Sequence, residues 1–209
     1  LTRIDLKSPL VLFLTGPTSA GKSTLSLYLT AYYNACTIRT RDIIASLLVR
    51  NRNLVSTNGK FARYIGRSIE EIPASVLRDF GVIIRDKHGQ KPLIQGLLQQ
   101  IGTKEQIIVI DAARTDKEIA ALENSTKASV VHWHIDAPFE VRQERFLRRS
   151  EKRSGDMAKE FAAYHGIDIT SLGLARSADQ ILYNNTTLEQ FHVLIDETLF
   201  QYLELRCLN

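Results

Sequence analysis

Residues 16–23 read GPTSAGKS and fit the phosphate-binding pattern G-x-x-x-x-G-K-[ST] at every fixed position. They follow an apolar run at 10–14 and precede a helical pattern, which is the context that this motif requires. Glycines let consecutive backbone N–H groups point at phosphate oxygens, and the helix N-terminus adds partial positive charge. In such loops the lysine contacts the β- and γ-phosphates, and the serine hydroxyl binds Mg²⁺. The sequence therefore predicts a site for ATP and Mg²⁺, made by Gly16, Thr18, Ser19, Ala20, Gly21, Lys22, Ser23 and Thr24.

Two carboxylates follow predicted strands, where ligands of open α/β sheets bind. Asp111 ends the apolar run 107–110 and is predicted to orient the metal or its water, with a helix N-cap as the alternative. Asp42 follows Arg41 beyond the second predicted strand. It is predicted to accept or align the proton of an attacking hydroxyl group, or to cap the next helix, and the two roles are compatible.

Arginines near the same sheet edge are candidates for binding phosphate oxygens. Arg114 is predicted to clamp an acceptor phosphate through two hydrogen bonds, and a solvated side chain is the alternative. The segment 140–153 is rich in arginine, and helical spacing puts Arg142, Arg145 and Arg149 on one side. We predict that Arg145 and Arg149 close over the transferred phosphate, because a guanidinium group pairs with several oxygens at once.

The composition is that of an ordinary globular protein, with 44% hydrophobic and 24% charged residues among 209. A formal net charge of +4 is a mild excess, too small by itself to argue for a nucleic-acid or membrane partner, and we do not expect nucleic acid as a partner. Cys36 and Cys207 are far apart in the sequence, and we interpret both as free thiols of a reducing, cytoplasmic protein. No apolar run reaches the length of about 18 residues that a membrane span needs, and we recognise no signal peptide.

Two further features of the sequence leave alternatives. The chain begins with Leu1, so we expect either a removed leader or tag, or a domain fused to others in a longer protein. His132 and His134 alternate around Trp133 and would share one face of a strand. No cysteine or carboxylate stands at metal-ligand spacing beside them, so we predict no zinc site there.

Strand and helix patterns alternate along the chain, which predicts right-handed βαβ units and a doubly wound α/β sheet. Predicted strands span 10–14, 35–38, 107–110, 130–135 and 180–183. Predicted helices span 22–33, 42–50, 68–79, 81–88, 93–101, 116–124 and 138–149, followed by a last helix that Thr186 and Glu189 would cap. Residues 51–105 lack a strand pattern and are expected to form an acceptor-binding helical insertion, and 149–178 a lid.

Several stretches together resemble one family. The phosphate loop, TRDII, IIVIDAARTDKEIAAL, HIDAPFEVRQERFLRR and ADQILYNNTTLEQF are similar to the nucleoside-monophosphate-kinase-like P-loop kinases. Within that group the chain resembles dephospho-CoA kinases and related adenylate-kinase-like proteins. The resemblance implies a single P-loop NTPase domain over residues 1–209, an α/β/α sandwich with a five-stranded parallel sheet of order 2-3-1-4-5, a helical acceptor lobe and a lid.

The resemblance also implies roles for single residues. Asp42 corresponds to the acidic residue near the acceptor, and Arg114 to the arginine on the acceptor side. Arg145 and Arg149 correspond to lid arginines. Asn184 corresponds to the asparagine near the adenine, and a turn residue is its alternative.

The sequence also departs from that family. Relatives carry an arginine where this chain has Ala45, and Arg41 or Arg50 would have to replace it.

The predicted activity is transfer of the γ-phosphoryl group of ATP to a small acceptor, without a covalent phosphoenzyme. Nucleotides or nucleosides are the first candidates for the acceptor, and dephospho-CoA is the second. One alternative is a nucleotide-sensing or hydrolysing module of a longer protein. Another is a nucleic-acid end kinase, which the small net charge and the lack of an aromatic, basic platform disfavour.

Overall fold

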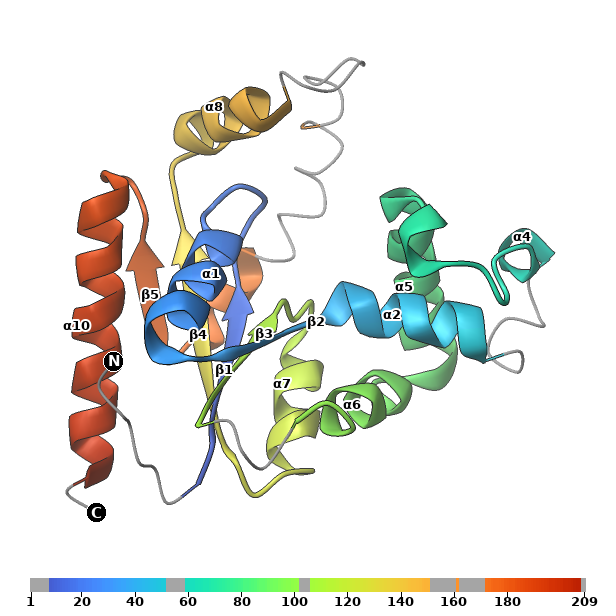
Figure 1. Cartoon of the computed structure of the whole chain (residues 1–209), viewed down its shortest axis with the longest axis horizontal. Coiled ribbons are helices and arrows are strands. Elements are labelled where there is room, and N and C mark those ends of the chain that lie inside the picture. Colours follow the sequence, from blue (N-terminus) through green and yellow to red (C-terminus); the bar gives the residue numbers. More distant parts are fainter. Residues whose placement is uncertain (1–7, 52–58, 102–105, 151–160, 162–171, 208–209) are drawn as a thin grey trace.

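The computed structural model describes residues 8–51, 59–101, 106–150, 161 and 172–207. Its sheet has five parallel strands in the order β2-β3-β1-β4-β5, which confirms the predicted order (Figure 1). The strands are β1 (Leu10–Thr15), β2 (Cys36–Arg39), β3 (Ile107–Asp111), β4 (Ser129–Asp136) and β5 (Gln180–Tyr183).

Helices surround this sheet on both faces. They are α1 (Lys22–Tyr33), α2 (Thr40–Arg50), α4 (Gly59–Ala62), α5 (Ala74–His88), α6 (Lys91–Leu98), α7 (Asp116–Glu123), α8 (Phe139–Ser150) and α10 (Leu188–Cys207). Two short 3₁₀ helices, η1 (Ile69–Glu71) and η2 (Leu174–Ser177), complete the described elements. In Figure 1, α2, α4, α5 and α6 lie together on the side of the sheet that ends in β2, and α10 lies beside β5.

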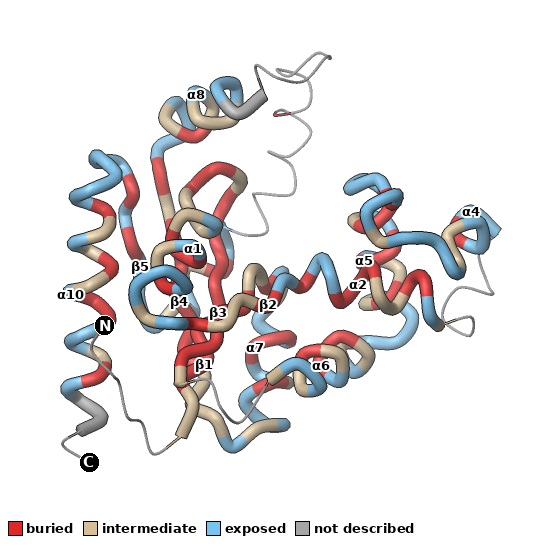
Figure 2. Tube along the Cα trace, in the orientation of Figure 1, coloured by how far each residue is buried: buried red, intermediate tan, exposed pale blue. Residues whose placement is uncertain are grey.

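Strand β1 is the centre of the molecule and is buried along its whole length (Figure 2). Its side chains alternate between two cores, as expected for a strand covered on both faces. Val11 and Phe13 pack in the core formed with α2, α5, α6 and α7. Leu10, Leu12 and Leu14 pack in the core formed with α1 and α10. The three-layer α/β/α sandwich predicted from the sequence is therefore confirmed.

The strand register brings the predicted site residues to one edge of the sheet. Asp111 is level with Leu14 of β1 and with Arg39 of β2. Since the phosphate loop follows β1 and α2 follows β2, the loop, Asp111 and the start of α2 all lie at the same edge of the sheet.

The helices predicted at 68–79 and 81–88 are wrong, because one helix, α5, spans Ala74–His88. The residue before a proline avoids the helical conformation, and Ile72, just before Pro73, has the extended angles φ −88° and ψ 117°. Gly81 is buried within α5 and does not end it. A Cβ atom at Gly81 would lie 2.9 Å from Cδ1 of Ile44, so the glycine permits close packing of α5 on α2.

The predicted cap of the last helix is one residue out of place. Helix α10 begins at Leu188, and the backbone N–H of Gln190 donates to the Thr187 hydroxyl at 3.3 Å. The Gln190 side chain accepts from the Thr187 N–H at 3.2 Å, which completes a capping box at Thr187 instead of Thr186.

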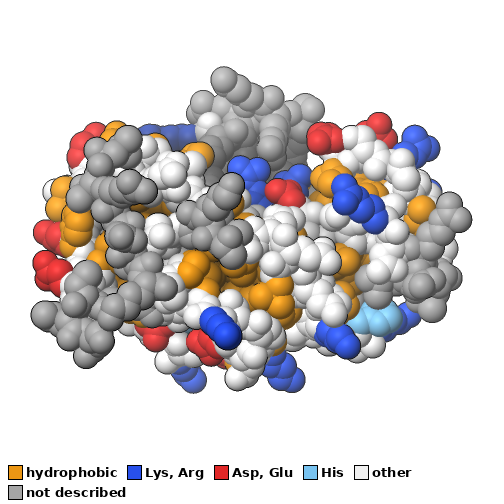
Figure 3. Space-filling model, turned by 60° about the horizontal axis from the view of Figure 1, so that its bottom comes forward, with side chains coloured by type: hydrophobic (Ala, Val, Ile, Leu, Met, Phe, Trp, Pro, Cys, Tyr) orange, Lys and Arg blue, Asp and Glu red, His pale blue; other side chains and the backbone are white. Residues whose placement is uncertain are grey.

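The surface carries charge in scattered places. On the face drawn in Figure 3, Lys and Arg side chains lie at several separate positions among acidic and hydrophobic ones. Among the described residues, no helix is both long and apolar enough to cross a membrane.

Candidate active site

The phosphate loop requires glycine at two positions. Gly16 and Gly21 have φ angles of 134° and 120°, which side chains disfavour. A Cβ atom at Gly16 would lie 2.1 Å from the carbonyl oxygen of Ile135, and one at Gly21 would lie 2.2 Å from Nδ2 of Asn184. Gly21 precedes α1 without a side-chain cap, so the first N–H groups of that helix face the loop. This cradle fits a phosphate group.

Lys22 lies over the same loop. Its Nζ donates hydrogen bonds to the carbonyl oxygens of Gly16 at 2.7 Å and Pro17 at 2.8 Å. These contacts hold the ammonium charge next to the phosphate cradle, where it is available to phosphate oxygens when the side chain turns.

Oxygen atoms suited to Mg²⁺ lie beside the cradle. The Ser23 hydroxyl donates to Oδ2 of Asp111 at 3.4 Å. The described residues contain no group of three or more His, Cys, Asp or Glu that would hold a metal alone. Mg²⁺ usually binds one or two carboxylates together with waters and phosphates, so the pair fits this ion when it arrives with a nucleotide. The N-cap alternative for Asp111 is wrong, because Thr115 caps α7.

A cavity of about 820 Å³ begins at the phosphate loop and extends toward α2 and α5. Lys22, Ser23 and Asp111 line it at the loop end. Five arginines also line it, namely Arg39, Arg41, Arg78, Arg85 and Arg114. Its apolar lining consists mainly of Ile44, Ala74, Leu77 and Val82. We call this the acceptor cavity.

The predicted acceptor residues divide at this cavity. Arg41 and Arg114 line it. Asp42 is exposed in the first turn of α2 and is not among the lining residues, so its predicted role stays a prediction. Its capping alternative is wrong, because the N-cap residue of α2 is Arg39. Sequence reasoning missed Arg78 and Arg85, because an arginine on a predicted helix gives no sign of the face that it occupies.

A smaller cavity of about 190 Å³ lies at another side of the loop. Its lining consists of Ser19, Gly21, Thr24, Arg145, Asn184, Thr186, Leu188 and Phe191. Asn184 is buried and donates from Nδ2 to the carbonyl oxygen of Ala20 at 2.7 Å. We call this the base cavity, since its apolar and amide groups suit a nucleotide base.

Two lid arginines were predicted to close over the transferred phosphate. Arg145 instead lines the base cavity and is absent from the lining of the acceptor cavity. Arg149 belongs to α8, and its side chain lies outside the described part of the structure. The predicted lid, 149–178, falls largely outside the described residues too.

Arg142 was predicted only to share a helix side with these two, but it is 3% exposed. Its Nε donates to the carbonyl oxygen of Ala137 at 3.1 Å, and NH1 lies 3.5 Å from the carbonyl oxygen of Thr18. The guanidinium group also lies 5.6 Å from the ring centre of Phe139. Arg142 therefore supports the phosphate loop from α8. A spacing of arginines cannot distinguish such a buried side chain from its solvated neighbours.

Two histidines meet below the phosphate loop. The Thr15 hydroxyl lies 2.6 Å from Nε2 of His132 and 2.9 Å from Nδ1 of His134. Both histidines thus share one strand face, as predicted. Burial lowers the pKa of both, that of His134 to about 4, so they are neutral near pH 7. They anchor the end of β1 and hold no metal cluster among the described residues.

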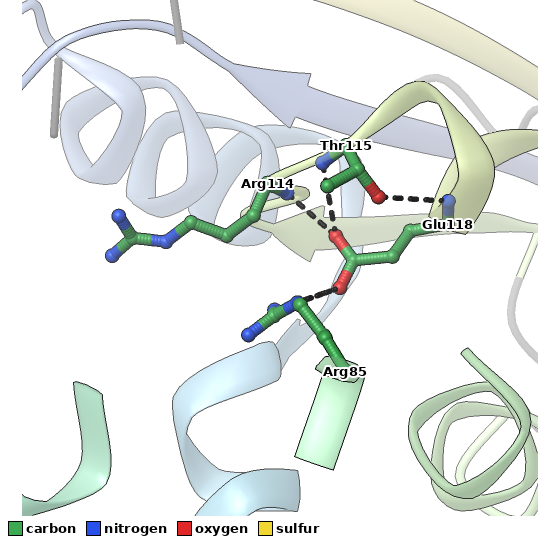
Figure 4. A network of polar contacts seen from close by, with 4 residues as sticks. All are labelled: Arg85, Arg114, Thr115 and Glu118. Atoms are coloured by element: carbon green, nitrogen blue, oxygen red, sulfur yellow. Dashed lines mark hydrogen bonds and ion pairs between the residues drawn. The ribbon is translucent and has the colours of Figure 1, made fainter. Parts of the chain in front are cut away.

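Glu118 was also missed as a site residue. Its side chain binds the backbone N–H groups of Arg114 and Thr115 and the guanidinium group of Arg85 (Figure 4). The spacing of Thr115 and Glu118 is a visible capping-box signal. The pairing with Arg85, which is 33 residues away, is not visible from spacing.

No family model and no curated protein matches the chain. Solved structures do. TT1252 from Thermus thermophilus has a TM-score of 0.58 and 17% identity, covering 93% of this chain and 98% of its own. A shikimate kinase from Acinetobacter baumannii in complex with shikimate has a TM-score of 0.53 and 14% identity, covering 95% of this chain and 94% of its own. A sugar kinase from Janibacter sp. HTCC2649 has a TM-score of 0.51 and 16% identity, covering 92% of this chain and 93% of its own.

These likenesses concern the fold. None of these three proteins is named as a dephospho-CoA kinase or an adenylate kinase, so that part of the resemblance stays a prediction. The sheet order and the coverage over nearly all of both chains show that this protein has a P-loop kinase fold.

Proposed function

We propose that the protein is an ATP- and Mg²⁺-dependent kinase that phosphorylates a small acceptor carrying an anionic group. One observation carries this proposal. Lys22 and Ser23 of the phosphate loop line the same cavity of about 820 Å³ as five arginines. A donor phosphate and an anionic acceptor would therefore meet within one space.

The charge of the acceptor cavity supports an anionic acceptor. Arginine presents a planar set of donors that pairs with phosphate or carboxylate through two hydrogen bonds. Of the two carboxylates that line the cavity, Asp79 forms an ion pair with Lys60 at 2.7 Å, and Asp111 lies at the loop end. The cavity thus holds an excess of positive charge, which attracts anions. Nucleotides and dephospho-CoA meet this requirement, whereas an uncharged nucleoside does not.

The apolar wall of the cavity supports an acceptor with an apolar body. Ile44, Leu77 and Val82 line it together with the charged groups. Small-molecule sites commonly combine an apolar lining with a few polar groups that fix the orientation of the ligand. A base, ring or chain would lie against this wall while its anionic group contacts the arginines.

The proposed reaction depends mainly on positioning and charge. Mg²⁺ bound with ATP would neutralise charge on the phosphates, held by Ser23 and by Asp111 directly or through water. The loop N–H groups would orient the triphosphate, and Lys22 would contact its outer phosphates. Arg149 is retained as a lid arginine, and Arg145 would act at the base cavity.

We also propose Asp42 as the group whose carboxylate accepts the proton of the acceptor hydroxyl. Asp42 directly follows Arg41, which lines the cavity, and belongs to the first turn of α2. No covalent phosphoenzyme is proposed.

An acceptor screen with coupled detection of ADP tests this function. The panel contains nucleoside monophosphates, the matching nucleosides, dephospho-CoA, shikimate and a neutral sugar. We expect ADP release that depends on an anionic acceptor and is absent in Lys22→Ala. Release that no acceptor changes would instead support the nucleotide-hydrolysing module, and turnover with the neutral sugar alone would contradict an anionic acceptor.

A further inference from the structure

The geometry points to Glu118 as a positioning residue that joins α5 to the segment carrying Arg114 and thereby sets the arginine wall of the acceptor cavity. This inference rests on the proposed function, since it concerns the acceptor side of the same site. Glu118 itself is not among the residues that line the acceptor cavity, and it acts through Arg85 and Arg114, which do line it.

Each carboxylate oxygen of Glu118 contacts a different part of the chain (Figure 4). Oε1 lies 2.8 Å from Nε and 2.7 Å from NH2 of Arg85, which belongs to α5. Oε2 accepts the backbone N–H of Arg114 at 2.6 Å and that of Thr115 at 3.3 Å. One side chain therefore connects two walls of the cavity that are far apart in the sequence.

A capping box alone does not account for this arrangement. In a capping box the glutamate needs to bind only the N-cap N–H, here that of Thr115. Oε2 is 0.7 Å closer to the nitrogen of Arg114 than to that of Thr115, as the distances of 2.6 and 3.3 Å give. The carboxylate thus fixes the backbone of the residue before the cap. In Figure 4 the Arg114 side chain extends away from Glu118, so the fixed backbone sets the point from which this cavity-lining side chain starts.

The ion pair with Arg85 is well shielded from water. The side chains of Arg85 and Glu118 are 14% and 3% exposed. In such surroundings, leaving one partner without the other is strongly unfavourable, so the two groups keep each other in place. A Cβ atom at Gly81 would lie 2.9 Å from NH1 of Arg85, so this glycine leaves room for the guanidinium group in the observed orientation.

Two of the cavity arginines, Arg85 and Arg114, therefore have different roles. The charge of Arg85 is balanced by Glu118, so Arg85 serves to position α5. Arg114 is held through its backbone and presents its guanidinium group away from that pair (Figure 4). None of Arg85, Arg114 and Glu118 lines the base cavity. Loss of Glu118 should consequently weaken binding of the acceptor and leave ATP binding nearly unchanged.

Glu118→Gln tests the inference, with Glu123→Gln as the matched control on the exposed end of α7. Steady-state kinetics use the acceptor found in the screen. For Glu118→Gln we expect the KM of the acceptor to rise about tenfold, as for loss of one charge-assisted hydrogen bond, and the KM of ATP to stay within about twofold. Glu123→Gln should match the wild type. An unchanged acceptor KM, or an equal rise of both KM values, would overturn the inference.

A second measurement does not depend on turnover. Hydrogen exchange of the Arg114 amide is compared between the wild type, Glu118→Ala and Glu123→Ala. We expect faster exchange only in Glu118→Ala, because this variant lacks the acceptor of that N–H group. Unchanged exchange in Glu118→Ala would contradict the positioning role.

The two proposals fail in distinguishable ways. If the wild type transfers phosphate to no acceptor of the panel, the proposed function fails, while the exchange result still decides whether Glu118 holds Arg114.

Discussion

Arg145 forms two hydrogen bonds to Asn184, and both residues line the base cavity. NH1 donates to the backbone oxygen of Asn184 at 3.1 Å, and NH2 donates to its Oδ1 at 3.2 Å. Because Asn184 also donates to Ala20 of the phosphate loop, these contacts form a chain from α8 through the residue after β5 to the loop. The asparagine thus fixes both the loop and the arginine beside the space proposed for the base.

Replacement of Asn184 by alanine should weaken ATP binding selectively. The change removes the Nδ2 donor to the carbonyl oxygen of Ala20 and the Oδ1 acceptor of NH2 of Arg145, and the loss of hydrogen bonds to buried polar groups is costly. We expect the KM of ATP to rise about tenfold, while the KM of the acceptor stays within about twofold. Asn185→Ala, at the exposed neighbouring position, is the control and should behave like the wild type. A rise confined to the acceptor would refute the assignment of the base cavity.

Replacement of Lys22 by alanine should abolish transfer without unfolding the protein. The ammonium group lies over the phosphate loop and contributes no apolar burial to either core. Removal of a cation that stabilises developing phosphate charge commonly lowers kcat by about a hundredfold or more. Transfer is measured by coupled ADP release and folding by circular dichroism. Lys127→Ala, at an exposed loop position, serves as the control. Turnover retained in Lys22→Ala would reject the assignment of the phosphate loop.

Asp42→Asn should lower kcat far more than it changes ATP binding. The amide has nearly the same size as the carboxylate but cannot take a proton from an attacking hydroxyl group. General-base catalysis is typically worth at least about a hundredfold in rate, so kcat should fall by that factor. Asp86→Asn, on the exposed face of α5, is the control. If kcat is unchanged, Asp42 contributes only to the first turn of α2, and Asp111 becomes the next carboxylate to test.

Much of the fold could be predicted because its signals are local. The motif at 16–23 identifies the strand-to-helix turn, and the continuous apolar runs of β1 and β3 indicate strands covered on both faces. The order of the strands came from the resemblance to a family. The prediction of two helices in place of α5 also had a local cause, because a glycine suggests that a helix is interrupted. The close packing of Gly81 against Ile44, which explains this glycine, is visible only in the structure.

The candidate site could be predicted less completely, because its polar pairs are distant in the sequence. Arg85 meets Glu118 across 33 residues, and Arg145 meets Asn184 across 39. Helical spacing indicates which arginines share a side of α8, but tertiary packing decides that Arg142 supports the phosphate loop. The long-range pairs fix which cations reach which cavity, and no spacing rule contains that information.

His134 should make the protein less stable as the pH falls below about 6.5. Its Nε2 is buried without a hydrogen-bond partner among the described residues, and burial lowers its pKa from 6.5 to about 4. The unfolded chain therefore binds a proton that the folded protein does not bind, so stability is full above about pH 6.5 and falls until about pH 4. From these two values the loss at pH 5 is about 2 kcal/mol. Urea unfolding at pH 7 and pH 5 measures it. In His134→Asn the difference between the two pH values should shrink by about that amount, whereas His88→Asn, at an exposed site, should keep it. An equal pH dependence in His134→Asn and the wild type would show that His134 is not kept neutral by burial.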